Sequence, residues 1–255
     1  MYKKPQVIFE LKSLEDTAHI ITSFFDDDST INGRFPTAIA QNFNINIPEL
    51  VGKTLDEKYE IILKALTPIF NDNLAEMQSK IKEYQDYWNA NANLVCSEFE
   101  KIFRIKFQGT EYYTAYVNIN TTCPRYLKDQ SFDVNFRNSK EEVLGTCIHE
   151  LIHFYWFIIW KEDFPDCPET NFEAPHVEWL LSEIAIDPIV YFSEFRKIMR
   201  EKPAYYYFYD TKIWGTENLI EVFRKLYKAN TLDNFMDRGL KLLNNNPDLV
   251  KELVK

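Results

Sequence analysis

The chain has 255 residues and a formal net charge of −10 at pH 7; glycine is scarce (6) and aromatic residues make up 16%. This length fits one large domain or two subdomains, and the composition favours a densely packed, helix-rich protein over a disordered or repetitive one. The acidic balance excludes nucleic acid as an expected partner, because binding it requires basic side chains that neutralise phosphates.

The N-terminal residues contain no apolar segment followed by a small-residue cleavage site, so no secretory signal is expected. The four cysteines are far apart and form no CxxC pair, which predicts reduced thiols. We therefore expect a cytoplasmic protein.

Residues 1–50 mix short apolar runs with turn residues and predict no well-placed element. Apolar side chains then recur with helical spacing over Leu55–Phe70 and Leu74–Phe103, which predicts long amphipathic helices that could break near Asn89–Asn93.

The period then changes. Phe103–Phe107 and Phe132–Phe136 alternate apolar and polar residues, Tyr113–Ile119 is rich in β-branched and aromatic residues, and Gln108–Thr110 indicates a turn. Three short strands in succession predict a small, mostly antiparallel sheet.

A capping box at Ser139–Glu142 predicts the start of a helix. This helix continues through an apolar run, Leu144–Trp160, which contains His149, Glu150 and His153. The glutamate and the short uninterrupted apolar part exclude a membrane span, so we expect a helix buried inside the protein.

His149 and His153 are four residues apart and therefore lie on one face of the helix. Two imidazoles so placed can bind one tetrahedral zinc ion, and Glu150 between them can act as a general base toward a metal-activated water. The alternative is that both histidines are core residues with hydrogen bonds of their own.

A third ligand is expected from a second helix, which Pro175 opens and which runs to about Asp187. Glu178 and Glu183 are the nearby candidates, and only Glu183 shares a helix face with His176 and Asp187. Pro188 suits the first position of a third helix that would run to about Arg200. The remaining chain predicts three helices: Glu217–Lys228, Leu232–Leu243 and Pro247–Val254.

The HELIH sequence, followed downstream by Ser182–Asp187, resembles the gluzincin class of zinc metallopeptidases over about residues 112–190. The resemblance implies that Glu183 is the third zinc ligand and that Asp187 orients a ligand histidine. Glu173, Glu178 and His176 remain alternative ligands.

Two further roles follow from the same resemblance. The strand Phe132–Phe136 would be a sheet edge that pairs with an extended substrate. A histidine or tyrosine would stabilise the developing oxyanion, and the candidates are His176, which we take as a candidate catalytic residue, and the cluster Tyr205–Tyr209.

We therefore predict an α+β, zincin-like fold: residues 1–160 carry the sheet and the active-site helix, and residues 161–255 form a helical C-terminal subdomain with the third ligand. The function expected is a zinc metallopeptidase, a hydrolase with one Zn²⁺ per chain that acts on a peptide or protein and not at a membrane. The alternatives are a non-catalytic interaction module that keeps a zinc-stabilised fold, and a peptidase dedicated to one partner. The sequence does not predict the oligomeric state.

Overall fold

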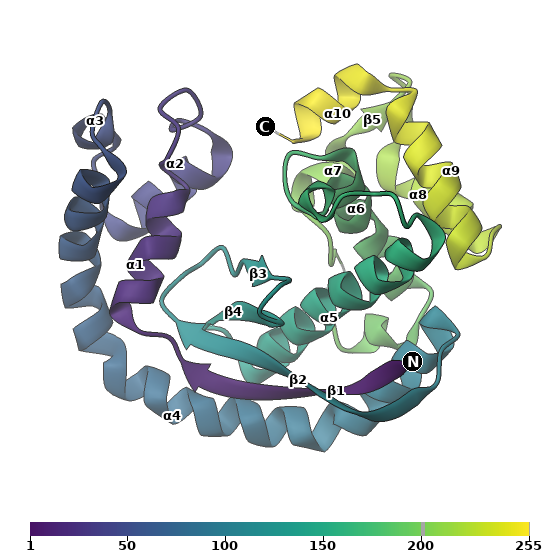
Figure 1. Ribbon diagram of the computed structural model, residues 1–255, viewed down its shortest axis with the longest axis horizontal. Coiled ribbons are helices and arrows are strands. Elements are labelled where there is room, and N and C mark those ends of the chain that lie inside the picture. The colour runs from purple at the N-terminus through teal and green to yellow at the C-terminus, as the bar shows by residue number, and fades with distance from the viewer. Residues whose placement is uncertain (200–201, 255) are drawn as a thin grey trace. The chain divides into compact units, whose positions relative to one another are not determined.

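The computed structural model describes residues 1–199 and 202–254, so the predicted end of a helix at Arg200 lies outside the described residues (Figure 1). The chain combines many helices with a small sheet and is of mixed α and β composition. It groups into two compact units. One comprises Gln6–Ala90 and Glu111–Val143; the other comprises Met1–Pro5, Asn91–Thr110 and the chain from Leu144 onward.

The first unit contains most of a four-stranded sheet with the strand order β1-β2-β4-β3. The strands are β1 (Tyr2–Leu11), β2 (Phe107–Asn118), β3 (Arg125–Tyr126) and β4 (Ser131–Asn135). β2 and β4 are parallel, from Thr114 opposite Ser131 to Asn118 opposite Asn135, while the short β3 pairs antiparallel with β4. The prediction of a mostly antiparallel sheet is therefore wrong at its centre. Residues 119–130 supply the crossover of about a dozen residues that a parallel pair requires.

The individual strands were predicted unevenly. β4 confirms the strand expected at Phe132–Phe136, and β2 includes the one expected from Tyr113. β2 begins earlier, at Phe107, so the turn predicted at Gln108–Thr110 is wrong. Gly109 takes φ +77° inside the strand, which lets a turn-like residue continue the extended chain.

The sheet edges also differ from expectation. β4 lies between β2 and β3, so Phe132–Phe136 is not the free edge expected to pair with a substrate. β1 is an edge strand, and Gln85 of α4 covers part of it: Phe9 N–H donates to Gln85 Oε1 (3.1 Å) and Gln85 Nε2 donates to Val7 O (3.0 Å). A side-chain amide thus pairs with this stretch of edge backbone.

The helices of this unit are α1 (Leu14–Ser23), α2 (Arg34–Phe43), α3 (Ile47–Leu50) and the first part of α4 (Leu55–Phe103). α4 joins both predicted helical segments without a break and includes Pro68. The Tyr84 hydroxyl of α4 lies 2.8 Å from Phe136 O and 2.6 Å from Asn138 O. It therefore holds the residues just before the capping box of the next helix.

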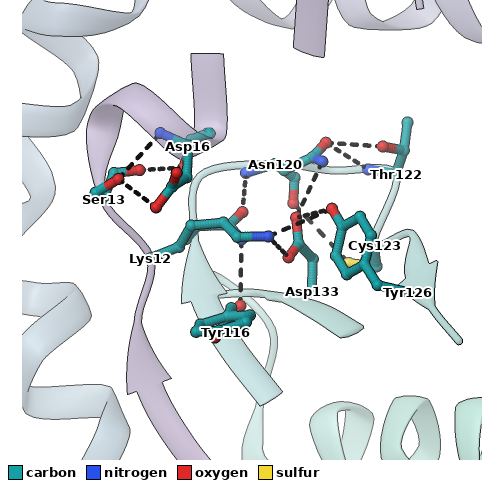
Figure 2. A network of polar contacts seen from close by, with 11 residues as sticks. Lys12, Ser13, Asp16, Tyr116, Asn120, Thr122, Cys123, Tyr126 and Asp133 are labelled. Atoms are coloured by element: carbon teal, nitrogen blue, oxygen red, sulfur yellow. Dashed lines mark hydrogen bonds and ion pairs between the residues drawn. The ribbon is translucent and has the colours of Figure 1, made fainter. Parts of the chain in front are cut away.

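A buried polar network joins the strands (Figure 2). Lys12, directly after β1, forms an ion pair with Asp133 of β4, and both are at most 6% exposed. Tyr126 of β3 accepts from Lys12 Nζ (3.3 Å) and donates to Asp133 Oδ2 (3.4 Å), and Asn120 donates to the same carboxylate. The ammonium also lies over the rings of Tyr116 and Tyr126. The ammonium and the carboxylate in this network are therefore paired with each other and hydrogen-bonded to neighbouring side chains.

The second unit is mainly helical. It contains most of α5 (Lys140–Asp163) together with η1 (Glu169–Phe172), α6 (Val177–Tyr191), η2 (Glu194–Lys197), α7 (Tyr206–Asp210), β5 (Lys212–Ile213), β6 (Glu217–Asn218), α8 (Leu219–Lys228), α9 (Leu232–Asn244) and α10 (Pro247–Leu253). The last three confirm the predicted C-terminal helices to within two residues at each end. From Leu144 onward, the HExxH helix belongs with these helices, whereas the sequence suggested a division near residue 160.

The helix expected to begin at Pro188 is not formed. Pro188 lies inside α6, which ends at Tyr191, and the short η2 follows. Residues Trp179–Val190 of α6 are all buried, and α6 packs against α8 and α9. Tertiary packing therefore stabilises α6 although it contains Pro188, a residue type that ordinarily interrupts a helix.

α5 is the one helix in the described part of the chain that is long and apolar enough to cross a membrane. However, 78% of its most apolar window is buried inside the protein, as in the core helix of a soluble protein. Aromatic contacts, such as Trp156 with Phe235 of α9 and Phe157 with Phe172, provide part of that burial. α5 thus fits the expected interior helix.

Candidate metal centre

α5 and α6 bring together three of the residues singled out in the sequence. His153 Nε2 lies 3.1 Å from His149 Nε2. Glu183 Oε2 lies 3.4 Å from His153 Nε2 and 3.6 Å from His149 Nε2. Among residues 1–199 and 202–254, His149, His153 and Glu183 are the His, Cys, Asp or Glu side chains that lie close enough together to hold one metal ion.

Local structure explains why the two histidines face one point. The predicted capping box is formed: Ser139 Oγ accepts from Glu142 N–H (3.2 Å) and Glu142 Oε2 accepts from Ser139 N–H (2.9 Å). It starts a regular helix whose spacing stacks residues 149 and 153 on one face. His153 is fully buried, and His149 keeps 21% of its side chain exposed, so the cluster is open at the His149 side.

The distances fit a tetrahedral ion. Zinc lies about 2.0–2.2 Å from imidazole nitrogen and carboxylate oxygen, so ligands at tetrahedral corners are separated by about 3.3–3.6 Å. The observed separations, 3.1, 3.4 and 3.6 Å, bracket this range. Two imidazole nitrogens and a carboxylate oxygen are electron-pair donors, and a cation at their centre would satisfy all three. Three protein ligands leave a fourth position free.

Glu150 lies beside the cluster without joining it. Its Oε1 is 3.9 Å from His149 Nε2, and the residue is only 6% exposed. A buried carboxylate next to a metal position is suited to accept a proton.

Asp187 follows Glu183 by one turn of α6 but does not have the partners expected. Arg224 of α8 donates to both of its oxygens, from Nε (2.7 Å) and Nη2 (3.0 Å), and the Tyr209 hydroxyl donates to Oδ2 (2.7 Å). Among the described residues, Asp187 forms no hydrogen bond with His149 or His153. The carboxylate that was predicted to orient a histidine is instead held by an arginine fork.

Tyr209 therefore acts as a hydrogen-bond donor. Burial, and then its hydrogen bond to Asp187, raise the pKa of Tyr209 well above the usual value, so that the hydroxyl keeps its proton. Of the other members of the predicted tyrosine cluster, Tyr205 and Tyr207 pack on one another and on Phe208, and the exposed Tyr206 lies against Tyr207.

The remaining candidates lie outside the cluster of three. His176 is exposed at the N-cap of α6 and makes no side-chain capping bond. Glu173 is exposed and Glu178 lies in the first turn of α6, so neither joins the two histidines. Cys147 is fully buried, and burial raises the pKa of its thiol.

Sequence reasoning missed Arg224. A signal was present: the charged Asp187 lies in a mostly apolar helix and so requires a partner. The sequence could not indicate which of the 29 Lys and Arg residues provides it.

Comparisons with protein-family models, curated proteins and solved structures give no match for this chain.

Proposed function

We propose that this protein is a zinc-dependent metallopeptidase with one zinc ion held by His149, His153 and Glu183. The observation that supports this most is the convergence of three electron-pair donors, from two helices, at separations suited to one tetrahedral ion. The HExxH spacing and the buried Glu150 beside the cluster add to it.

The roles of the residues follow from their positions. A bound zinc ion would polarise a substrate carbonyl and lower the pKa of a water molecule at the free position. Glu150 would take the proton from the attacking water and pass it to the leaving amine. The rigid α5 holds Glu150 and both histidines in fixed relative positions, which favours proton transfer over a short and constant distance.

Metal content is the first test. Plasma mass spectrometry on the purified wild type should give one zinc per chain, and His149→Ala and Glu183→Ala should lose it. Glu178→Ala, which removes a carboxylate from the same helix but outside the cluster, is the matched control and should keep its zinc. A folded wild type that takes up no zinc when the ion is supplied would rule out the proposal.

Glu150→Gln tests catalysis separately from metal binding. We expect this variant to keep its zinc and to lose about 10²–10⁴-fold in kcat on a peptide substrate, as loss of a general base does. Glu141→Gln, an exposed glutamate in the first turn of α5, should change neither quantity.

Peptide libraries provide the substrate for this measurement. Zinc binding without cleavage of any library peptide, casein or denatured protein would favour the two alternatives, a non-catalytic module stabilised by zinc and a peptidase dedicated to one partner. Cleavage that Glu150→Gln leaves unchanged would show that another group is the base.

A further inference from the structure

The position of Glu183 depends on how α6 is held, because the two histidines lie on a different helix. α6 is apolar around most of its circumference and buries every residue from Trp179 to Val190. The hydrophobic effect is non-directional and does not by itself set the rotation of an apolar helix, whereas the hydrogen bonds of a buried carboxylate are directional. A ligand oxygen must nevertheless be held to within about 0.5 Å for a metal site to keep its geometry.

Asp187 is the feature of α6 that can fix this rotation. It follows Glu183 by four residues, so the two carboxylates lie on the same face of the helix, one turn apart. Asp187 is fully buried. A buried carboxylate without partners would cost several kcal/mol, roughly as for other buried ions, so the orientation of α6 is tied to groups that can pair with Asp187.

Arg224 provides that pairing in a directional form. Its Nε and Nη2 bind both oxygens of Asp187 at 2.7 and 3.0 Å, and Tyr209 adds a third hydrogen bond. Two parallel N–H···O bonds fix the angle between partners as well as the distance, which a single charge does not.

Arg224 is itself held on two further sides. Its guanidinium lies 3.9 Å from the centre of the Tyr191 ring, at the end of α6, and Nη1 binds Glu221 at 2.8 Å. Arg224 therefore contacts α6 at two positions one turn apart, Asp187 and Tyr191, and so restrains rotation as well as sliding of that helix.

We infer that Arg224 is a positioning residue for the metal centre: through Asp187 it sets the rotation of α6 and so the distance from Glu183 to the two histidines. The inference rests on the proposed function in that Glu183 is taken as a metal ligand. A positioning role differs from a purely structural role of Arg224 because loss of the arginine then weakens metal binding in a protein that is still folded.

The test is zinc affinity, measured by competition with a chromophoric chelator on zinc-free protein whose fold is verified by circular dichroism. Arg224→Met should weaken zinc binding about 10-fold or more, the range seen when groups that orient ligands are removed. Arg224→Lys, which keeps the charge and loses the fork, should fall between this variant and the wild type. Arg238→Met on α9, an exposed arginine, is the charge-matched control and should bind like the wild type.

The visible spectrum of the cobalt-substituted protein gives a second readout, because it reports the geometry of the ligands. We expect Arg224→Met to change the band positions and Arg238→Met to leave them unchanged. Should Arg224→Met fail to fold, Tyr209→Phe removes one hydrogen bond from the same carboxylate and should show the same changes in smaller measure.

The outcomes separate the two proposals. A wild type that binds zinc, with folded Arg224 variants of equal affinity and equal cobalt spectrum, overturns the positioning role alone. Lower thermal stability at unchanged zinc affinity does the same, since it assigns Arg224 to the fold only. A wild type that binds no zinc overturns both the positioning role and the metallopeptidase.

Discussion

The protein buries two polar clusters that differ in how their charges are arranged. In the buried polar network that joins the strands, called here the network at the strand ends, the Lys12 ammonium faces the Asp133 carboxylate. Tyr126 and Asn120 donate further hydrogen bonds to this carboxylate (Figure 2). In the cluster between α5 and α6, two imidazole nitrogens and a carboxylate oxygen face one another.

The balance of charge, and not burial, distinguishes the two clusters. Burial alone does not distinguish the clusters, since Asp133, His153 and Glu183 are all at most 3% exposed. The network at the strand ends is electrically balanced by residues of the chain. In the cluster between the helices, three electron-pair donors converge, and a cation from outside would balance them.

The largest expected effect concerns the balanced network. Lys12→Met leaves the buried Asp133 without its cation and should lower the free energy of unfolding by about 3–5 kcal/mol. The double variant Lys12→Met/Asp133→Leu should lose less than the two single changes together, with a coupling of about 1–3 kcal/mol. Urea unfolding of the four proteins measures both quantities.

A matched surface pair calibrates this measurement. Lys82 and Asp86 of α4 form an exposed ion pair, so Lys82→Met should cost about 1 kcal/mol or less. A Lys12 variant no less stable than the Lys82 variant would show that the buried pair does not organise the strand ends.

The next effect distinguishes the clusters by their response to metal. Zinc at 100 times its dissociation constant should stabilise the wild type by about 2.7 kcal/mol, because the ion binds the folded state. His153→Ala should lose this increment. Lys12→Met should keep it although its baseline stability is lower. A zinc increment that disappears in Lys12→Met as well would mean that the two clusters do not behave independently.

The smallest effect concerns the thiol nearest the motif. Cys147 is fully buried, and burial raises the pKa of its thiol, so little reactive thiolate forms. At pH 8, iodoacetamide should modify the half-buried Cys123 and Cys167 first and reach Cys147 only on unfolding. Mass spectrometry of digests, with and without zinc, measures this order. Modification of Cys147 in the folded protein as fast as that of Cys123 and Cys167 would contradict this order.

Local signals in the sequence predicted the parts that depend on local physics. The capping box at Ser139, the helical spacing of His149 and His153, and the three C-terminal helices all follow from residues close in the chain. Glu183 was one of two local candidates, chosen through a shared helix face and a resemblance, and the structure places it beside both histidines.

Interactions between distant residues could not be predicted in the same way. The parallel pairing of β2 with β4 depends on a crossover, which periodicity does not report. Pro188 remains helical because α8 and α9 bury α6 around it. Arg224 is 37 residues from Asp187, and no spacing rule connects them.

Gln85 has a consequence for the colloidal behaviour of the protein. Its amide offers one acceptor to Phe9 and one donor to Val7, as a neighbouring strand would, but it has no further groups in register. A second molecule could extend the sheet along this stretch of β1 only by displacing the side chain and breaking both bonds. Gln85 thus occupies this stretch of the edge as an added strand would, which opposes edge-to-edge pairing there.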